Sequence, residues 1–196
     1  MKKAGCYLIY YGFESGNQDA LLEIHKGFNK NNRYGQLIDL LHDNGISVQG
    51  TFIFGFDADD PTIFDETTQL VNDLRIDIPR YSILTPYPGT RLFERMQRER
   101  RILSYNWDDY DTMHLVFEPK KMSPDDLYAG FKRAYQQTFK MSHILQRLRG
   151  LNFQSVINIS GNLTYRNFAK RLMTDPGYAQ PFRAKVQGDP TPNLAE

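Results

Sequence analysis

Hydrophobic and polar positions follow two periods in the first half of the chain, which predicts strands separated by helices. Apolar, aromatic and β-branched residues dominate three short runs, at 5–13, 46–56 and 80–84, as is typical of β-strands. Apolar residues at helical spacing predict intervening helices at 19–26, 33–43, 61–74 and 91–98. Strands that alternate with helices imply right-handed crossovers and a parallel sheet, so we expect an α/β fold.

The central run is apolar at nearly every position, whereas a half-exposed strand would alternate. This pattern predicts a strand buried on both faces, as in a parallel sheet covered by helices. Asp57, Asp59 and Asp60 follow at once, and Asp60 before Pro61 predicts a helix N-cap. The carboxyl end of such a strand is where α/β folds place their ligands. Gly55 lets a ligand or another backbone come close there.

The pattern changes after about residue 102. Aromatic residues stand among aspartates in a long irregular segment, and we expect them to pack back on the sheet: Tyr105, Trp107, Tyr110 and Phe117. Ser123 before Pro124 predicts a helix start, with the helix running to 149 and ending at Gly150. Further helices are expected at 152–159 and 163–173, with a break at 160–162 and a disordered tail over 175–196.

Composition excludes some classes of protein. The net charge of +1 argues against a nucleic-acid partner, and we interpret one arginine run as a solvated helix end: Arg95, Arg98, Arg100 and Arg101. No segment approaches the roughly 18 apolar residues of a membrane span, and the first residues do not have a signal-peptide pattern, so we expect neither feature. The single cysteine, Cys6, fits a reducing compartment, so we expect a cytoplasmic protein. Cys6 and the four histidines lack metal-ligand spacing, and we expect no metal ligands.

The three strand ends meet at one edge of a parallel sheet and carry the candidate chemistry. Glu14 and Ser15 follow the first strand, residues 55–57 the second, and Thr85 with Pro86 the third. Glu14 can accept hydrogen bonds from an amine or ribose hydroxyls, and Ser15 can donate and accept. Structural alternatives stay open: Glu14 as a helix cap, Gly55 as helix–strand clearance, and residues 85–90 as a rigid turn.

Three motifs in order carry a family resemblance. Gly-Phe-Glu-Ser-Gly-Asn-Gln (12–18), Gly-Thr-Phe-Ile-Phe-Gly-Phe-Asp-Ala-Asp (50–59) and Ile-Leu-Thr-Pro-Tyr-Pro-Gly-Thr (83–90) together resemble the second half of a radical S-adenosylmethionine (SAM) enzyme core. The chain is most similar to the subgroup that often carries an N-terminal cobalamin-binding domain. The resemblance implies a partial TIM-type barrel over 1–103, with three parallel strands and crossover helices, and a helical extension over 104–174.

The resemblance also implies a cofactor site. Glu14 and Ser15 match the strand end that contacts the ribose or methionyl part of SAM. Phe54, Gly55 and Phe56 match the strand near the adenosine, while Leu84, Thr85 and Pro86 match the one whose backbone meets adenine. In the family, a 4Fe-4S cluster held by a CxxxCxxC loop starts 5′-deoxyadenosyl-radical chemistry on a small-molecule substrate. That loop is absent here, so we expect the chain to be inactive alone; cobalamin use is left open.

Three strands cannot close a barrel, and the outer side of the first strand needs a partner. The candidates are a missing N-terminal half-barrel or a second copy of the chain. Two other functions remain open. One is a non-catalytic half-barrel that acts as a binding or assembly module. The other is an unrelated α/β enzyme that binds phosphate at the helix starts near Pro61 and Thr90.

Overall fold

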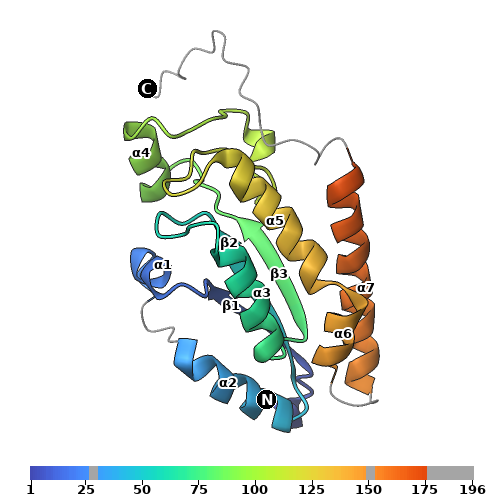
Figure 1. The fold of residues 1–196 in the computed structure, drawn as a ribbon. Helices are drawn as coiled ribbons and strands as arrows, with labels where there is room; N and C mark the ends of the chain where they lie inside the picture. The colour runs from blue at the N-terminus through green and yellow to red at the C-terminus, as the bar shows by residue number, and fades with distance from the viewer. Residues whose placement is uncertain (27–30, 149–152, 176–196) are drawn as a thin grey trace.

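A computed structural model of the protein describes residues 1–26, 31–148 and 153–175. Three parallel strands form one open sheet in the order β1 (Leu8–Glu14), β2 (Ser47–Phe54) and β3 (Ile78–Ile83). Helices separate the strands along the chain and further helices follow, which confirms the predicted α/β class (Figure 1). Because the strands are parallel, their carboxyl ends lie at one edge of the sheet.

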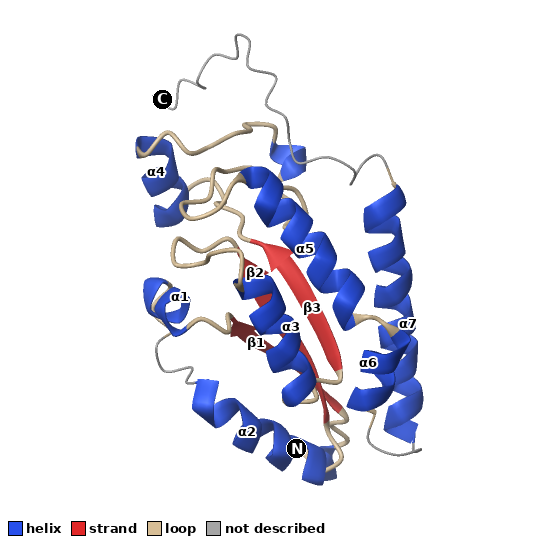
Figure 2. Cartoon of the chain, in the orientation of Figure 1, coloured by secondary structure: helices blue, strands red, loops and turns tan. Residues whose placement is uncertain are grey.

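The helices form the second layer. They are α1 (Gln18–Glu23), α2 (Asn31–Asp43), α3 (Ile63–Asp73), α4 (Arg91–Arg98), α5 (Pro124–Thr138), α6 (Met141–Arg147) and α7 (Phe153–Thr174), with short 3₁₀ turns at Lys2–Ala4 and Trp107–Asp109. Helices α3 and α5 lie side by side across one face of the sheet, α7 lies beside β3, and α6 packs against α3 and α5 (Figures 1 and 2). None of the helices within these described ranges combines the length and hydropathy needed to cross a bilayer.

The core lies between the sheet and the α3–α5 layer. Phe54 of β2 packs against Phe64 of α3 and Tyr81 of β3, with ring centroids 4.8 and 5.3 Å apart. On the opposite face of β2, Ser47 and Thr51 are buried, whereas Gln49 and Ile53 remain partly exposed. The prediction that the central strand is buried on both faces is therefore correct for the face that α3 and α5 cover and correct only in part for the other face.

The outer edge of β3 is closed by groups of the chain itself. Pro79 has no N–H, as is usual for proline on an edge strand. The Tyr135 hydroxyl of α5 donates to Tyr81 O at 2.8 Å and accepts from Tyr81 N at 3.2 Å. Ile83 N donates to Thr112 O at 2.7 Å. The sheet therefore ends at β3.

The outer edge of β1 is open, because β2 is its only neighbour among the described strands. Leu8 pairs with Ser47, and Ser47 N donates to Tyr7 O at 2.9 Å. This register turns the main-chain groups of Tyr10 away from β2. The Tyr10 side chain, in the middle of the strand, is 59% exposed. The sheet can therefore be extended only on the side of β1.

Helix α3 begins later than predicted. Its N-cap is Thr62, whose side chain makes no capping hydrogen bond, and Ile63 is the first helical residue. Asp60 Oδ1 accepts from Thr62 N at 2.8 Å and from Thr62 Oγ1 at 2.7 Å. The Asp60 carboxylate therefore caps a turn that precedes the helix, and the prediction of a helix starting at Pro61 is wrong.

The helix predicted to run from residue 124 to 149 is divided in two. Its start is confirmed: Ser123 and Asp126 form a reciprocal capping box. Helix α5 ends at Thr138, and Arg147 of α6 donates to Thr138 O at 2.9 Å. The Arg147 side chain satisfies a carbonyl that α5 leaves free at its end. Gly150, the predicted end, lies outside the described residues.

Helix α7 is continuous where a break at 160–162 was predicted. A Cβ on Gly161 would lie 2.8 Å from Ile78 Cδ1, so glycine allows the helix to pack closely on β3. Asn162 Nδ2 donates to Asp77 O and Asn158 O, both at 2.7 Å. These tertiary contacts outweigh the low helix propensity of the segment. Most of the predicted tail, 176–196, lies outside the described residues.

The aromatic residues of the irregular segment do not all pack on the sheet. Phe117 joins the main core, as predicted. Tyr110 instead packs in a separate cluster with Phe93 and Val116, against which Tyr105 also lies. Trp107 is 49% exposed. The prediction is therefore correct for Phe117 alone, because helix α4 supplies a second apolar surface for the others.

We predict that Tyr135→Phe destabilises the protein by about 1–3 kcal/mol, because it leaves the buried Tyr81 main-chain groups unpaired. Urea denaturation followed by circular dichroism measures the change. Tyr87→Phe is the control, since Tyr87 is exposed and its hydroxyl makes no hydrogen bond with the described residues. Equal stability of the two variants would contradict the role given to Tyr135.

Candidate functional site at the carboxyl edge of the sheet

A cavity of about 300 Å³ lies at the carboxyl edge of the sheet, at the lower limit for small-molecule sites. Phe56 and Leu84, predicted from two different strand ends, both line it. The remaining lining comes from the end of α1 and from α4: Glu23, Ile24, His25, Arg91, Leu92 and Arg95. Two strand-end residues that are distant in sequence, Phe56 and Leu84, therefore lie on the walls of the same cavity.

Phe54 and Gly55, two other predicted residues, contact protein rather than the cavity. Phe54 is fully buried in the core. Gly55 has φ of 105°, and an added Cβ would lie 2.9 Å from both Leu127 Cδ1 and Phe117 Cζ. The absence of a side chain at Gly55 thus allows α5 and the 104–122 segment to pack closely against the strand end. This is the structural role, helix–strand clearance, given above as the alternative to ligand binding.

Glu14 and Ser15 lie at the end of β1. A register shift after Gly12 precedes Glu14, whose φ of 68° lies in the left-handed region. Its carboxylate pairs with Lys26 and does not cap α1, because Asn17 Oδ1 accepts from Asp19 N at 2.9 Å. Ser15 is buried, and its hydroxyl accepts from Asn17 N at 3.0 Å. Neither residue lines the cavity.

Thr85 and Pro86 are buried in the turn that follows β3. Thr85 Oγ1 donates to Ile83 O at 3.1 Å. At the end of this turn, Thr90 Oγ1 accepts from Phe93 N at 3.2 Å and caps α4. All eight predicted site residues therefore lie at one edge of the sheet, but only Phe56 and Leu84 reach the cavity.

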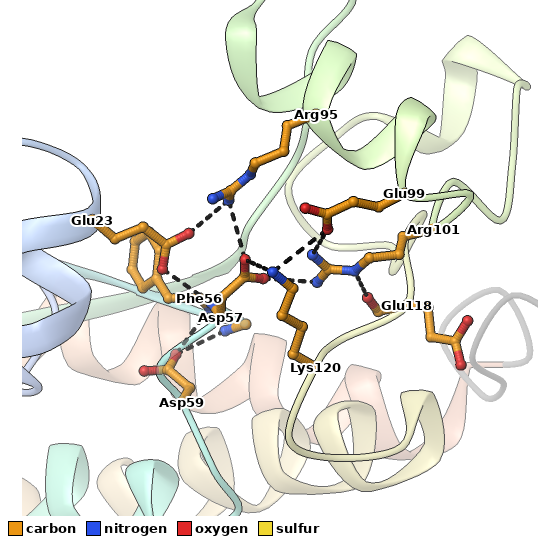
Figure 3. A network of polar contacts seen from close by, with 10 residues as sticks. Glu23, Phe56, Asp57, Asp59, Arg95, Glu99, Arg101, Glu118 and Lys120 are labelled. Atoms are coloured by element: carbon orange, nitrogen blue, oxygen red, sulfur yellow. Dashed lines mark hydrogen bonds and ion pairs between the residues drawn. The ribbon is translucent and has the colours of Figure 1, made fainter.

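A charge network beside the cavity is centred on Asp57 (Figure 3). Its carboxylate lies 2.8 Å from Arg101, 2.8 Å from Lys120 and 3.3 Å from Arg95. Burial alone would raise the pKa of Asp57, but the contacts with Lys120 and Arg101 and the charge of Arg95 hold it below its usual value. Asp57 is therefore a carboxylate at neutral pH and ties three cationic segments to the end of β2.

Glu23 extends this network to α1. Its Oε1 lies 2.7 Å from Arg95, and its Oε2 accepts from Asp57 N at 3.1 Å. The hydrogen bond to Glu23 is the main reason that the pKa of Arg95 is raised. The end of α1, the loop after β2 and helix α4 are thus joined across one side of the cavity (Figure 3).

The arginine run predicted to be a solvated helix end is only partly so. Arg101 is buried, and its Nε donates to Glu118 O at 2.7 Å, in addition to its contact with Asp57. Arg95 also faces Asp57, whereas Arg98 and Arg100 are exposed. The prediction is wrong for Arg95 and Arg101, because both arginines pair with the partly buried Asp57 carboxylate.

Asp59 fixes the backbone of the cavity wall. The residue is 1% exposed, and its Oδ2 accepts from Gly55 N at 3.0 Å and from Phe56 N at 3.1 Å. Burial raises the pKa of Asp59 to about 7. Asp59 Oδ1 is buried and has no partner among the residues described. The conformation of Phe56 therefore depends on a side chain three residues further along the chain.

The sequence reasoning missed the partners of Asp57, which are Glu23 through the main chain and Arg95, Arg101 and Lys120 through the carboxylate. One signal pointed to them: an aspartate directly after a buried strand needs compensating charge. The partners lie as far as residue 120 in sequence, and nothing in their local pattern indicates which of the chain's 24 lysines and arginines would supply that charge.

The residues present do not fit an iron–sulfur cluster. Cys6 precedes β1, at the opposite end of the sheet from the cavity, and its Sγ lies 3.8 Å from Leu8 O. Cluster ligation requires several thiolates, and the chain contains one cysteine. Across ranges 1–26, 31–148 and 153–175, no group of three or more His, Cys, Asp or Glu residues is placed to hold a metal ion.

Residues 90–170 match a family model described as a domain of unknown function, DUF4070. The chain is 40% identical over 172 residues to the bacteriochlorophyllide d C-12(1)-methyltransferase of Chlorobaculum tepidum, an alignment that covers 87% of the chain and 37% of that enzyme. It is 28% identical to the C-8(2)-methyltransferase of the same organism, covering 83% and 36%. It is 25% identical to an anaerobic magnesium-protoporphyrin IX monomethyl ester cyclase of Rubrivivax gelatinosus, covering 74% and 26%.

The chain is therefore related to one part of these methyltransferases and of this cyclase. It spans little more than a third of the length of the two methyltransferases. The matched family model begins at Thr90 and ends at Lys170, so it covers α4, α5, α6 and most of α7 and leaves out the three strands. The relation to the first methyltransferase covers 87% of the chain and therefore includes β2 and β3.

We predict that Asp57→Asn destabilises the protein by about 1–2 kcal/mol at pH 7, because the three surrounding cations lose the negative charge with which they pair. The partly exposed cations remain solvated, which limits the loss. The folded pKa of Asp57 lies below its usual value, so its contribution is present above about pH 4 and is lost at lower pH. Denaturation at pH 7 and at acidic pH measures this. Asp108→Asn, at an exposed site, is the control; an equally small effect of both changes at pH 7 would count against the network.

The effect of Asp59→Asn on stability should depend on pH in the opposite direction. The pKa of Asp59 rises from 3.8 to about 7 on folding, so the folded protein binds the extra proton between these values. The wild-type therefore loses stability as pH rises from about 4 to 7, and the variant lacks this loss. We predict that the stability of Asp59→Asn relative to wild-type increases from pH 5 to pH 7 and then levels off. Asp60→Asn, at an exposed position, should show no such trend; a flat difference for Asp59→Asn would refute the prediction.

Proposed function

We propose that this chain forms the SAM-facing edge of a radical SAM methyltransferase. The observation that carries the proposal is the arrangement of the strand ends: Phe56 and Leu84, expected at a SAM site from their motifs, line one cavity at the carboxyl edge of a parallel sheet. The 40% identity to a methyltransferase supports the same reaction class. Fold alone would not, because one α/β architecture serves many reactions.

The residues have distinct parts in this proposal. Glu14 and Ser15 approach the ribose or methionyl part of SAM, and Phe54, Gly55 and Phe56 lie near the adenosine. Leu84, Thr85 and Pro86 border the adenine through their backbone. When bound, SAM supplies the reactive group; the chain binds and orients it and excludes water. Asp59 keeps the Gly55–Phe56 backbone in place, and the Asp57 network holds the surrounding segments.

The rest of the barrel, with the thiolates of a 4Fe-4S cluster, belongs to polypeptide outside this chain. It pairs with β1, because the β3 edge is closed by Tyr135 and Thr112 while β1 has one neighbour. Without that segment we expect no SAM cleavage. Whether cobalamin takes part depends on that segment. The same open edge also favours a second candidate, a non-catalytic module that uses β1 only for assembly.

Reconstitution separates these two functions. The chain is co-expressed with the part of the Chlorobaculum tepidum C-12(1)-methyltransferase that it does not match, and iron and sulfide are added without oxygen. We predict that the purified complex, with a reductant, converts SAM to 5′-deoxyadenosine, whereas neither part does so alone. Chromatography of the products gives the yield. A complex that forms and holds its cluster but cleaves no SAM would leave only the assembly function.

Two substitutions in β1 test whether the partner binds at this strand edge. Tyr10→Pro removes an outward-facing N–H and should reduce complex formation at least tenfold, without disturbing the pairing of β1 with β2. Tyr10→Val keeps the N–H and should bind as the wild-type does. Equal binding of both variants would place the partner elsewhere on the chain.

A further inference from the structure

A groove lies between helices α5 and α7 and shares no lining residue with the cavity at the carboxyl edge. Two hollows of about 330 and 460 Å³ form it, and Gln136 lines both. The two helices pack against each other and run in opposite directions (Figure 1). The groove follows α5 from Asp125 to Gln136, about 16 Å at the helical rise of 1.5 Å per residue. It is therefore long enough to hold about three turns of another helix.

The floor of the groove is apolar. Tyr128, Phe139 and Ala169 lie buried in it. Ala129 is exposed beside them, and the Met173 side chain is 45% exposed at one end of the groove. Methionine adapts its shape to different apolar partners. Such a floor suits the apolar stripe of an amphipathic helix.

Basic side chains form the rims of the groove. The five that line it are Lys132, Arg133, Lys140, Arg166 and Lys170. One acidic residue, Asp125, also lines it, so five positive charges and one negative charge give a formal charge of +4. The whole chain carries +1, which leaves −3 for all other residues together. The positive charge is therefore concentrated in this groove.

Carboxylates of the protein compensate little of this charge. No carboxylate of the described residues pairs with Lys140, Arg166 or Lys170. Arg133 lies 3.6 Å from Asp65, but the two side chains are 45% and 62% exposed, and so open a pair contributes little. Arg166 is held at the rim because its Nη1 donates to Phe139 O at 2.7 Å. The groove thus presents cations that an anionic partner can pair.

A nucleic acid fits this groove less well than an acidic protein does. Single strands bind by stacking bases on aromatic side chains as well as by pairing phosphates with cations. Tyr128 and Phe139 are only 2% and 1% exposed, so neither offers a ring face to a base. In addition, Lys132 Nζ lies over the Tyr128 ring, 4.6 Å from its centroid.

We propose that this groove binds an acidic amphipathic helix of a partner protein. The apolar stripe of that helix lies on the floor, and its glutamates or aspartates face the two basic rims. Apolar burial supplies affinity, while the complementary charges raise the association rate and fix the orientation. Both helices of the groove pack on β3, whereas the half-barrel of the proposed function pairs with β1. The partner is therefore a different protein from that half-barrel.

Two designed peptides test the proposal on the full chain. The acidic peptide has roughly 15 residues, with leucine on one face at helical spacing and glutamate at the flanking positions. The neutral peptide carries glutamine in place of every glutamate. We expect the acidic peptide to bind with micromolar affinity and about tenfold more tightly than the neutral peptide, as measured by fluorescence anisotropy at low salt. Added salt should reduce this difference, because it screens exposed charges.

Charge reversal on both rims locates the binding site. A chain with Lys140→Glu and Lys170→Glu should bind the acidic peptide about tenfold more weakly and the neutral peptide within about a factor of two of wild-type. The matched control carries Lys3→Glu and Arg98→Glu, which change the net charge equally at exposed positions outside the groove. This control should retain most of the affinity for the acidic peptide. Circular dichroism checks that both variants are folded.

Several outcomes would overturn the proposal. Equal affinities of the wild-type for the two peptides would remove the role of charge, and an equal loss in the two variants would place binding outside the groove. Tighter binding of a short single-stranded oligonucleotide than of the acidic peptide would identify the partner as a nucleic acid. A dimer seen by sedimentation in wild-type and lost on reversing Lys140 and Lys170 would make a second copy of the chain the occupant.

Discussion

The fold depends on where the backbone hydrogen bonds of a three-stranded sheet are satisfied. A buried N–H or C=O without a partner costs about 1–3 kcal/mol, so each edge of the sheet needs a specific solution. At β3 the chain supplies it, with Pro79 lacking the donor and Tyr135 and Thr112 pairing the remaining groups. At β1 no described strand pairs with the outer edge. Because of this asymmetry, a further strand could pair with the sheet only on the side of β1.

A second constraint acts at the carboxyl edge. Asp57, which follows β2, is partly buried and Asp59 is fully buried, and the two carboxyl groups are stabilised in different ways. Asp57 remains charged because three cations surround it, whereas Asp59 is neutralised in part by protonation near pH 7 and accepts from two main-chain donors. One aspartate thereby joins distant segments, and the other sets the local backbone. Together they define a cavity whose walls come from α1, β2, β3 and α4.

The sequence predicted the α/β class, the three parallel strands, the start of α4 and the capped start of α5, because periodicity and capping depend on neighbouring residues. It failed where tertiary contacts decide. Asn162 and Gly161 look like a helix break but form the docking surface of α7, and Arg147 ends α5 from nine residues away. In the candidate site, the motifs located Phe56 and Leu84 correctly at one edge. They did not reveal Arg91, Arg95 or Glu23, whose roles depend on how helices pack.

The small antiparallel bridge between Ile102 and Phe117 gives the chain a further property. It joins the last turn after α4 to the segment that leads into α5, and Phe117 itself reaches the core beside Gly55. Truncation near residue 103 would therefore strip Phe117, Leu127 and Tyr135 from the sheet at the same time. The strands and the C-terminal helices consequently share one core, and neither part could be replaced without changing the packing surface of the other.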